Sequence, residues 1–475
     1  MTPNTINPVE RPLQVAVIGS GGAAMAGALR AASLGARVTL VERGTLGGTC
    51  VNVGCVPSKT MIRAAEVAHL RANSAFDVGL SRHEVEIDRP KLVEQQQRLV
   101  AMLRDTKYRK VLDSEPAITV VEGNAAFQTP HSLRVRKPSG QEEEIRFDYA
   151  LIATGALPYI PPIPGLAETP FWTSTEALNC SRMPRHLIII GSSIVAVELA
   201  QAFVRLGSRV TILARRTLLH HENWEISEQL SRVLTDEGVE IMTGVEADEV
   251  AFSDDRFMVV ANGLGLVSDA LLIAAGRAPN TRELGLDAVG VVTRPDGAIE
   301  VDDYLRTSAV NIFAAGDCTT LPQFVYVAAA AGTRAADNML GRNRKLDLSV
   351  LPRVIFTDPE AAAVGWSEAE AAGQGIKVAT RTLSLEHLPR AVVNHRTDGL
   401  IKMIAEVETG RILGVRIVAA GASEVIETAA LAIRCGLTVT QLADELFPYL
   451  TMTEGLKLTA QSFSRDVAKL SCCAG

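Results

Sequence analysis

Apolar positions along the chain fall into short continuous runs that alternate with longer segments of helical spacing. Runs at 13–18 and 38–41 flank a helical segment that extends to Leu34, and runs at 187–190 and 210–213 flank a second one. Short apolar runs that alternate with helical segments are typical of βαβ units in a parallel sheet. The pattern therefore predicts an α/β fold built from two such units.

The first unit carries a glycine-rich turn directly after its first strand. Gly19, Gly21 and Ala24 have the G-x-G-x-x-A spacing of a dinucleotide-binding turn, and the next strand ends at Glu42. Gly19 would form the tight turn, Gly21 would let the backbone approach a pyrophosphate, and the following helix would supply amide donors. Glu42 would accept a hydrogen bond from an adenosine ribose. A Rossmann dinucleotide site is predicted here.

The second unit has the same layout with a different charge at the ribose-reading position. Its turn begins at Gly191, while Ser193 and an alanine replace the second and third glycines. Its second strand ends in Arg215 and Arg216, where the first unit has Glu42. An acid accepts a hydrogen bond from a free ribose 2′-hydroxyl, whereas arginines pair with a 2′-phosphate. We therefore expect a 2′-phosphorylated dinucleotide such as NADPH here; the alternative is that the arginines only begin a solvated loop.

Cys50 and Cys55 lie in a polar, glycine-rich stretch that follows the first unit's second strand. A disulfide between residues so close in sequence removes little chain entropy, so it is a poor structural crosslink. In a regular helix two residues five apart lie about 8 Å from each other, beyond disulfide reach, which predicts a backbone distorted by Gly54 and Pro57. A small strained ring is readily reduced and re-formed. We interpret the pair as a redox dithiol rather than as two buried apolar cysteines.

Residues 47–59, Gly-Gly-Thr-Cys-Val-Asn-Val-Gly-Cys-Val-Pro-Ser-Lys, resemble the active-site signature of the pyridine nucleotide–disulfide oxidoreductases. That family includes glutathione reductase, dihydrolipoamide dehydrogenase, large thioredoxin reductases and mercuric reductase. Its other motifs follow in order across nearly the whole chain. The resemblance implies two Rossmann-like domains, for FAD and for NADPH, and a C-terminal α+β domain that pairs two subunits. The expected boundaries are 13–165 with 287–347 for FAD, 166–286 for NADPH and 348–475 for dimerisation.

The resemblance also implies roles for residues outside the fingerprint turns. Lys59, near the start of a helix expected over 58–71, would lie near the flavin ring. Asp317 would hold the ribityl chain from the start of a helix, and the Val325 backbone would face the flavin pyrimidine. Further cofactor contacts are expected at Gly44, Thr49, Ala125, Thr154, Gly155 and Gly276. Two glutamates are candidate catalytic carboxylates, Glu198 and Glu454.

One departure from the family pattern concerns the general acid–base of the disulfide-reducing members. In those members the leaving thiolate is protonated by the histidine of a His-Pro-Thr motif, which the partner subunit contributes and which a glutamate follows in sequence. The matching stretch here is Phe447-Pro-Tyr449-Leu-Thr451-Met-Thr-Glu454, so tyrosine replaces the histidine. No histidine follows His395, and tyrosine is a poor base at neutral pH because it ionises near pH ~10. The departure argues against glutathione, lipoamide or trypanothione as the substrate.

The chain ends in Cys472-Cys473-Ala-Gly475. Adjacent cysteines form a disulfide only with a strained peptide, so a structural crosslink is a poor explanation. A tail with two adjacent thiolates suits the capture of a soft, thiophilic cation, and a bland tail with incidental cysteines is the alternative. Some thioredoxin reductases also end in a Cys-Cys tail. The tail together with Tyr449 makes the chain resemble the mercuric ion reductase branch of the family.

That resemblance implies a reaction sequence, which we state as an expectation. NADPH reduces FAD, and the flavin reduces a Cys50–Cys55 disulfide, with Cys50 the exchanging thiol and Cys55 in contact with the flavin. Hg(II) would be captured by Cys472 and Cys473 of the partner subunit in a homodimer, passed to the inner pair and released as Hg(0). Two tyrosines are candidates to line the inner metal site, Tyr449 and Tyr108, the latter in a helix expected over 89–113.

Two other functions stay open at this point. A thioredoxin reductase that uses the tail as its second dithiol predicts a histidine at position 449, which is a tyrosine here. A flavoprotein that sequesters thiophilic metal predicts stoichiometric uptake without continuing NADPH consumption.

Composition and charge argue against several other classes. With 475 residues the chain is long enough for three domains, and a formal net charge of −7 leaves no basic field for nucleic acid or a membrane surface. The polar start lacks the features of a signal peptide, and seven cysteines, an odd number, suit a reducing cytoplasm. We expect residues 1–12 to be disordered. No Cys-x-x-Cys pair precedes Leu13, so metal delivery would rely on the tail or on cellular thiols.

Overall fold

The computed structural model of the protein describes residues 11–81 and 85–466. The chain divides into two compact units. The first comprises Met1–Ser58, Val93–Tyr159 and Gly276–Asp347, and the second comprises Lys59–Leu92, Ile160–Ala275 and Leu348–Gly475. Most of the segment predicted to be disordered, and the Cys472-Cys473 tail, lie outside the described residues.

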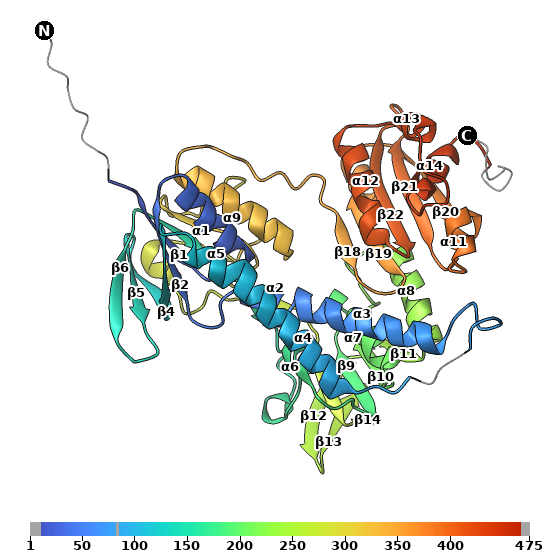
Figure 1. The fold of residues 1–475 in the computed structure, drawn as a ribbon, viewed down its shortest axis with the longest axis horizontal. Coiled ribbons are helices and arrows are strands. Elements are labelled where there is room, and N and C mark those ends of the chain that lie inside the picture. The colour runs from blue at the N-terminus through green and yellow to red at the C-terminus, as the bar shows by residue number, and fades with distance from the viewer. Residues whose placement is uncertain (1–10, 82–84, 467–475) are drawn as a thin grey trace, which may run out of the picture. The chain divides into compact units, whose positions relative to one another are not determined.

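A parallel sheet of five strands forms the centre of the first unit, in the order β17-β7-β1-β2-β3 (Figure 1). Its strands are β1 (Gln14–Ile18), β2 (Arg37–Glu42), β3 (Ile118–Glu122), β7 (Tyr149–Ile152) and β17 (Ile312–Ala314). The register places Val17 beside Leu40 on one side and Leu151 on the other. All three side chains are buried, as expected for strands covered on both faces.

Two helices of this unit pack side by side, α1 (Gly22–Ser33) and α9 (Val325–Met339) (Figure 1). An added Cβ atom on Gly332 would lie 2.1 Å from the carbonyl oxygen of Ala23, so only glycine permits this approach. The same packing brings the first residue of α9 next to the turn that begins α1, because a Cβ atom on Gly22 would lie 3.1 Å from its side chain.

A smaller antiparallel sheet and a two-stranded ribbon complete the first unit. The sheet contains β4 (Asn124–Thr129), β5 (Ser132–Arg136) and β6 (Glu142–Arg146). The ribbon pairs β8 (Ala156–Pro158) with β16 (Arg277–Pro279).

The helix expected over 89–113 is interrupted. It forms as α4 (Arg89–Arg104), a π-helical turn (Asp105–Arg109) and α5 (Lys110–Asp113). The Thr106 hydroxyl donates to the carbonyl oxygen of Met102 at 2.8 Å, the group that would accept the Thr106 amide in a regular helix. Such a bond competes with the helical ladder, and π-helical turns are frequent at functional sites.

The second unit contains the other parallel sheet, in the order β11-β10-β9-β15. Its strands are β9 (His186–Ile190), β10 (Arg209–Ala214), β11 (Val239–Thr243) and β15 (Ala270–Ile273), and its helices include α7 (Ile194–Arg205) and α8 (Trp224–Asp236). The predicted βαβ arrangement is confirmed. Three further strands form an antiparallel sheet: β12 (Ala247–Ser253), β13 (Arg256–Ala261) and β14 (Leu264–Ser268).

The C-terminal part of the second unit is an α+β domain, as predicted (Figure 1). Its antiparallel sheet has the order β18-β19-β22-β21-β20. The strands are β18 (Arg353–Ile355), β19 (Glu360–Gly365), β20 (Val378–Ser384), β21 (Leu400–Glu406) and β22 (Ile412–Ala419), and the helices include α12 (Ala422–Arg434) and α14 (Glu454–Gln461). Its core consists mainly of Ile, Val, Leu and Ala side chains contributed by the sheet and these helices.

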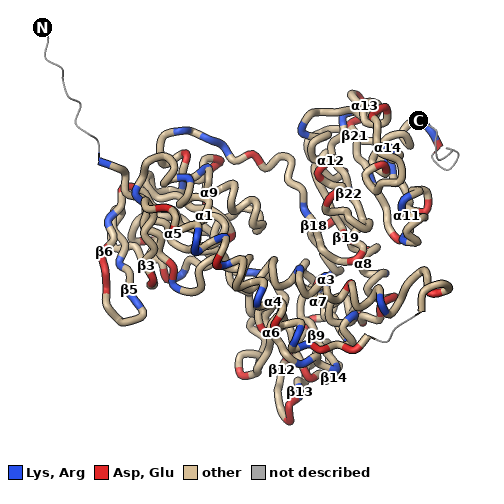
Figure 2. Tube along the Cα trace, viewed as in Figure 1, with Lys and Arg blue, Asp and Glu red and all other residues tan. Residues whose placement is uncertain are grey.

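Charged residues of both signs are interspersed along the described chain (Figure 2). Among the helices of residues 11–81 and 85–466, none combines the length and apolar character needed to cross a membrane.

Candidate functional site

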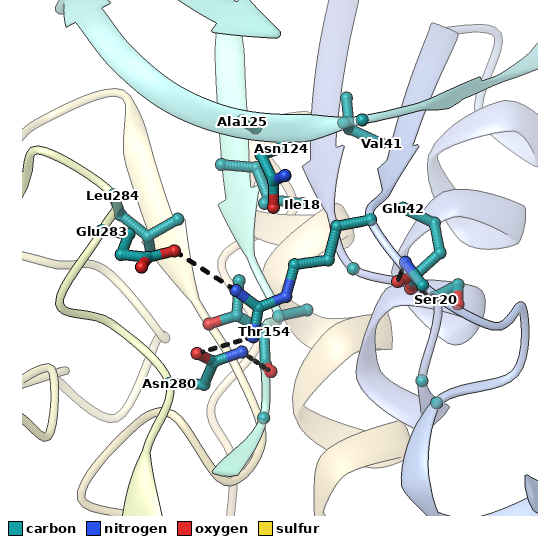
Figure 3. A pocket seen from close by; sticks show the side chains of 18 of the residues that line it. Ile18, Ser20, Val41, Glu42, Asn124, Ala125, Thr154, Asn280, Glu283 and Leu284 are labelled. Atoms are coloured by element: carbon teal, nitrogen blue, oxygen red, sulfur yellow. Dashed lines mark hydrogen bonds and ion pairs between the residues drawn. The ribbon is translucent and has the colours of Figure 1, made fainter. Parts of the chain in front are cut away.

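A cleft of about 630 Å³ lies at the carboxyl ends of the parallel strands in the first unit (Figure 3). Nucleotides bind at this edge of open α/β sheets, and the volume is that of a ligand site. Eight residues predicted to contact the cofactor line it: Gly19, Gly21, Glu42, Gly44, Thr49, Ala125, Thr154 and Gly155. Ala24 is instead fully buried in α1, and neither Asp317 nor Val325 is among the lining residues.

The glycine turn at the base of the cleft has no room for side chains. Gly19 has a φ of +109°, and a Cβ atom there would lie 2.4 Å from the carbonyl oxygen of Ala153. A Cβ atom on Gly48 would lie 2.6 Å from the Cα atom of Gly21. Bare backbone therefore faces the N-terminus of α1, which is the arrangement that binds a pyrophosphate.

The Glu42 carboxylate is held in place by two hydrogen bonds (Figure 3). Its Oε2 accepts from the Ser20 hydroxyl at 2.5 Å, and its Oε1 accepts from the Gly44 amide at 2.7 Å. The Ser20 hydroxyl oxygen in turn accepts from the Gly47 amide at 3.0 Å. Each carboxylate oxygen keeps lone-pair capacity, so Glu42 can still accept from a ribose hydroxyl.

The opposite wall of the cleft is built by Asn280 (Figure 3). Its side-chain amide donates to the Thr154 carbonyl oxygen at 3.3 Å, and its Oδ1 accepts from Arg43 at 3.1 Å. The Thr154 hydroxyl is buried without a hydrogen-bond partner among the described residues. Because buried polar atoms are normally satisfied, this orphan hydroxyl fits a bound polar ligand. The glycine turn, the Glu42 carboxylate and the Thr154 hydroxyl together fit a bound dinucleotide.

The position of Asp317 differs from the prediction. It lies in a turn after β17, eight residues before α9, and not at the start of a helix. Gly316, at φ +82°, and Thr319 form this turn, with the Thr319 amide donating to the Gly316 carbonyl oxygen at 3.0 Å. Burial raises the pKa of Asp317, and Arg277, 3.8 Å away, acts in the opposite direction. Val325 is the first residue of α9, where a backbone amide has no acceptor within the helix.

The two motif cysteines lie on consecutive helices. Cys50 is half-buried in α2 (Gly48–Val53), and Cys55 is exposed as the first residue of α3 (Cys55–Ala72). The helical path is interrupted at Gly54, between α2 and α3. A Cβ atom on Gly54 would lie 3.0 Å from the Thr49 carbonyl oxygen and 3.2 Å from the Cys50 Cα atom. The predicted distortion is therefore found at Gly54. Pro57 does not contribute, because it lies in the first turn of α3, where proline fits without distortion.

Asn52 ties the segment around the cysteines to its surroundings. Its side-chain amide donates to the carbonyl oxygens of Leu46 at 3.0 Å and Gly48 at 2.8 Å, and its Oδ1 accepts from Arg104 at 3.2 Å. Arg104 is the last residue before the π-helical turn. The same anchor therefore holds the cysteine segment and the end of α4.

Tyr108 lies on the π-helical turn and is half-buried. A Cβ atom on Gly47 would lie 3.5 Å from its ring, so the ring packs against the start of the cysteine motif. Burial raises the pKa of Tyr108, and the charges of Cys50 and Cys55 act in the same direction. The phenol is therefore protonated at neutral pH and lies within electrostatic range of both thiols.

Lys59 and Glu198 form an ion pair at 2.7 Å in the second unit. Glu198 is buried in α7, and its Oε1 accepts from the Phe356 amide at 2.9 Å. The Lys59 ammonium lies 4.5 Å from the centroid of the Phe356 ring. The loop after β18 therefore holds both members of the pair. Lys59 is also one helical turn after Cys55 on α3.

The second glycine turn repeats the geometry of the first. Gly191 has a φ of +125°, and a Cβ atom there would lie 2.3 Å from the Ala274 carbonyl oxygen. Ser193 caps α7 by accepting from the Ala196 amide, and its hydroxyl donates to the Ala274 oxygen at 2.9 Å. Arg215 and Arg216 are exposed after β10, and Gly276 lies in a turn at φ +114°.

Comparison with known families identifies the fold. The profile of the pyridine nucleotide-disulphide oxidoreductases matches residues 13–332, and that of their dimerisation domain matches residues 351–460. The chain belongs to this family. Membership implies a flavin and NADPH as cofactors, and the dimerisation domain indicates a homodimer.

Within this family the chain is similar to proteins named mercuric reductase. It is 57% identical to that of Acidithiobacillus ferrooxidans, over 98% of this chain and 85% of the relative, and 46% identical to that of Streptomyces lividans, over 97% and 98%. Among solved structures, the Cu(II) complex of the HOCl-induced flavoprotein disulfide reductase RclA from Escherichia coli has a TM-score of 0.87 at 32% identity, covering 96% of this chain and 100% of that chain. LpdA from Mycobacterium tuberculosis has a TM-score of 0.86 at 28% identity, covering 95% and 100%.

Tyr449 and Glu454 both lie within the residues matched by the dimerisation-domain profile. Tyr449 lies in the loop before α14 with a relative exposure of 51%. Glu454 is the first residue of α14; its Oε2 accepts from the Leu450 amide at 3.2 Å, and burial raises its pKa. The glutamate therefore shapes the loop that presents Tyr449.

Several supporting residues of this family member were missed by the sequence reasoning: Ser20, Asn52, Arg104, Asn280 and Phe356. Ser20 and Asn52 lie inside the quoted motifs, so a polar residue within a glycine-rich turn was an available signal. The other three reach their partners across 52 to 237 residues of sequence, and no local pattern marks such contacts.

Proposed function

We propose that this chain is an NADPH-dependent flavoenzyme that reduces Hg(II) to volatile Hg(0). The observation that carries the proposal is a dithiol with the protonated phenol of Tyr108 beside it, in a chain that has no histidine after His395. Whole-chain similarity to seven proteins named mercuric reductase, at 44% to 57% identity, supports it.

The first cleft is the proposed FAD site. The backbone at Gly19 and Gly21 would bind the pyrophosphate, Glu42 the adenosine ribose, and Asp317 the ribityl chain. A flavin bound there supplies two-electron transfer between NADPH and the sulfur pair. Overall, NADPH and Hg(II) give NADP⁺, a proton and Hg(0), so electrons and charge balance.

The proposed task of the dithiol is to hold the metal ion. Hg(II) is a soft cation that prefers thiolate ligands, and Cys50 and Cys55 can bind it as a pair. Cys55 is the first residue of an 18-residue helix, where the helix dipole favours a thiolate. Tyr108 can donate a hydrogen bond to a thiolate or line the metal site. Transfer between thiol pairs needs no general base, which is consistent with the missing histidine.

We further propose that Cys472 and Cys473 of the partner subunit deliver Hg(II) to this pair, with Tyr449 near the path of transfer. Glu198 and Lys59 would act together beside the flavin. A cytoplasmic location would supply the NADPH and the free thiols that this chemistry needs.

The test is NADPH oxidation by the purified protein with HgCl₂ in excess thiol, beside parallel assays with thioredoxin, oxidised glutathione and lipoamide. Sustained oxidation with Hg(II) alone, and mercury vapour leaving the tube, is the expected result. Cys50→Ala should abolish turnover because one of the two thiolate ligands is lost. The matched control is Cys435→Ala, which changes an exposed cysteine at the end of α12 and should keep full activity.

Two outcomes would replace the proposal. Turnover with thioredoxin in place of Hg(II) would make the tail a redox relay. A single burst of NADPH oxidation with no further turnover would indicate a metal-sequestering flavoprotein.

A further inference from the structure

The segment after β10 links the second glycine turn to the C-terminal domain. It begins with Arg215 and Arg216 and ends at Asn223, the residue before α8. Its first part carries the arginines assigned to the 2′-phosphate of NADPH under the proposed function. Its second part contains two adjacent histidines, His220 and His221, for which the proposed reaction has no role.

Buried contacts fix the course of this segment. The Leu219 amide donates to the carbonyl oxygen of Ser192 at 2.9 Å, and Ser192 lies within the second glycine turn. Leu218 and Leu219 are buried, and the Leu218 carbonyl oxygen accepts from the Ser227 hydroxyl at 2.6 Å. Leu219 has a φ of +51°, which turns the chain sharply before His220.

The far end of the segment is tied to the C-terminal domain. Glu222 pairs with Arg353 at 3.5 Å, and the side-chain oxygen of Asn223 accepts from Arg416 at 2.7 Å. Arg416 is fully buried, so this contact is shielded from water. With both ends held, the exposed residues between them keep a defined position next to the glycine turn.

The groups around His220 are mostly cationic. Arg215 and Arg216 act on it electrostatically, and the His221 ring lies 3.8 Å from its ring, centroid to centroid. Two carboxylates lie near the segment: Glu246 pairs with Arg215 at 3.4 Å, and Glu222 pairs with Arg353 and acts electrostatically on His221. Within residues 11–81 and 85–466 no carboxylate forms an ion pair with Arg216 or His220, so these two groups have no counter-anion of their own.

We propose that His220 is a third cationic group of the 2′-phosphate site, and that it takes up a proton when the phosphate binds. The inference rests on the proposed use of NADPH and adds a specificity residue to it. In a Rossmann unit, Ser192 corresponds to the turn that binds the pyrophosphate, and Arg215 to the position that contacts the adenosine ribose. Residues 216–219, which run from Arg215 to the contact with Ser192, therefore border the ribose 2′-phosphate. His220 is the exposed side chain that follows the contact with Ser192.

The direction of the effect follows from electrostatics. Burial lowers the pKa of His220, and the charges of His221, Arg216 and Arg215 lower it further, so the imidazole is neutral in the empty site near pH 7.5. A dianionic phosphate favours the imidazolium and raises that pKa. Binding should therefore consume up to about one proton, and affinity should rise as the pH falls toward about 6, where the phosphate itself begins to protonate.

The experiment is isothermal titration calorimetry of the holoenzyme with 2′,5′-ADP as the probe. Titrations at pH 7.5 in two buffers of different ionisation enthalpy give the number of protons taken up. His220→Gln should remove most of this uptake and weaken binding by roughly twofold to fivefold at pH 6.5, with a smaller loss at pH 8. His221→Gln is the matched control and should keep the uptake. Affinity for 5′-AMP, which differs from 2′,5′-ADP only by lacking the 2′-phosphate, should be equal in all three proteins.

The outcomes separate this inference from the function on which it rests. Proton uptake that persists in His220→Gln, or that is lost in His221→Gln instead, would overturn the role of His220 and leave NADPH use intact. A wild-type protein that binds 5′-AMP as tightly as 2′,5′-ADP would overturn both, because no 2′-phosphate site would then exist.

Discussion

Tyr108 differs from the surface tyrosines of the chain because two thiols lie within electrostatic range of its hydroxyl. Burial raises its pKa, with Cys50 and Cys55 adding to the shift, so the group is a hydrogen-bond donor and not a base at neutral pH. A donor beside a thiolate stabilises the charged sulfur and lowers the thiol pKa. The residue can therefore influence both metal binding and the pH at which the dithiol becomes nucleophilic.

Tyr108→Phe should lower kcat/KM for Hg(II) by roughly tenfold to a hundredfold, the value of one hydrogen bond to a charged group. The lower limb of the pH–rate profile should move to higher pH, because the thiol loses a stabilising donor. The rate at which NADPH reduces the enzyme without metal should not change. Tyr304→Phe is the control, since the Tyr304 ring instead contacts Arg306 and Lys345. An unchanged profile would restrict Tyr108 to packing.

At the scale of elements, the contact between α1 and α9 supports the cofactor cleft. Gly332→Ala would place a methyl group 2.1 Å from the Ala23 carbonyl oxygen, so the helices must separate. Overpacking of this kind costs about 1–3 kcal/mol, and the temperature at which flavin fluorescence signals cofactor release should fall. Gly373→Ala, at the end of helix Glu368–Gly373 where a Cβ atom meets nothing within 4 Å, should leave that temperature nearly unchanged. Equal behaviour of the two variants would contradict the packing argument.

The same scale shows what the sequence could predict. Strands β1 and β2 and the turn at Gly19 were predicted because hydrophobic spacing and the positive φ of glycine are local properties. Hydrophobic spacing does not predict the π-helical turn at Tyr108, and the Thr106 hydroxyl bond does not mark it either, because the same bond occurs in the regular helices α9 and α14. The helix start expected at Asp317 rests on the family resemblance, whereas residues 318–324 are Cys-Thr-Thr-Leu-Pro-Gln-Phe and α9 begins only at Val325.

Across the whole molecule, the sequence indicates single functional residues more readily than the residues that pair with them. Lys59 and Glu198 are separate candidates from the sequence, yet their pairing joins residues 139 positions apart, and the Phe356 amide that holds Glu198 comes 158 positions after it. Hydrophobic periodicity describes only residues that are close in sequence. Contacts between residues more than a hundred positions apart can therefore be identified only in the three-dimensional structure. The charge difference between Glu42 and Arg215 can be recognised from the sequence alone, because the two βαβ units repeat one local pattern and place these residues at the same position.

The proposed division of labour between subunits makes a prediction that concerns the dimer as a whole. A subunit with Cys50→Ala has no working inner dithiol, and a subunit with Cys472→Ala and Cys473→Ala has no tail thiols, so each homodimer should fail with bulky thiol complexes of Hg(II). The two chains, co-expressed with different affinity tags and purified through both, give a mixed dimer. If the tail serves the partner subunit, the intact dithiol of one chain meets the intact tail of the other, and about half of the wild-type activity should return. If each tail serves its own subunit, the mixed dimer has no complete site and stays inactive, which would contradict a shared active site.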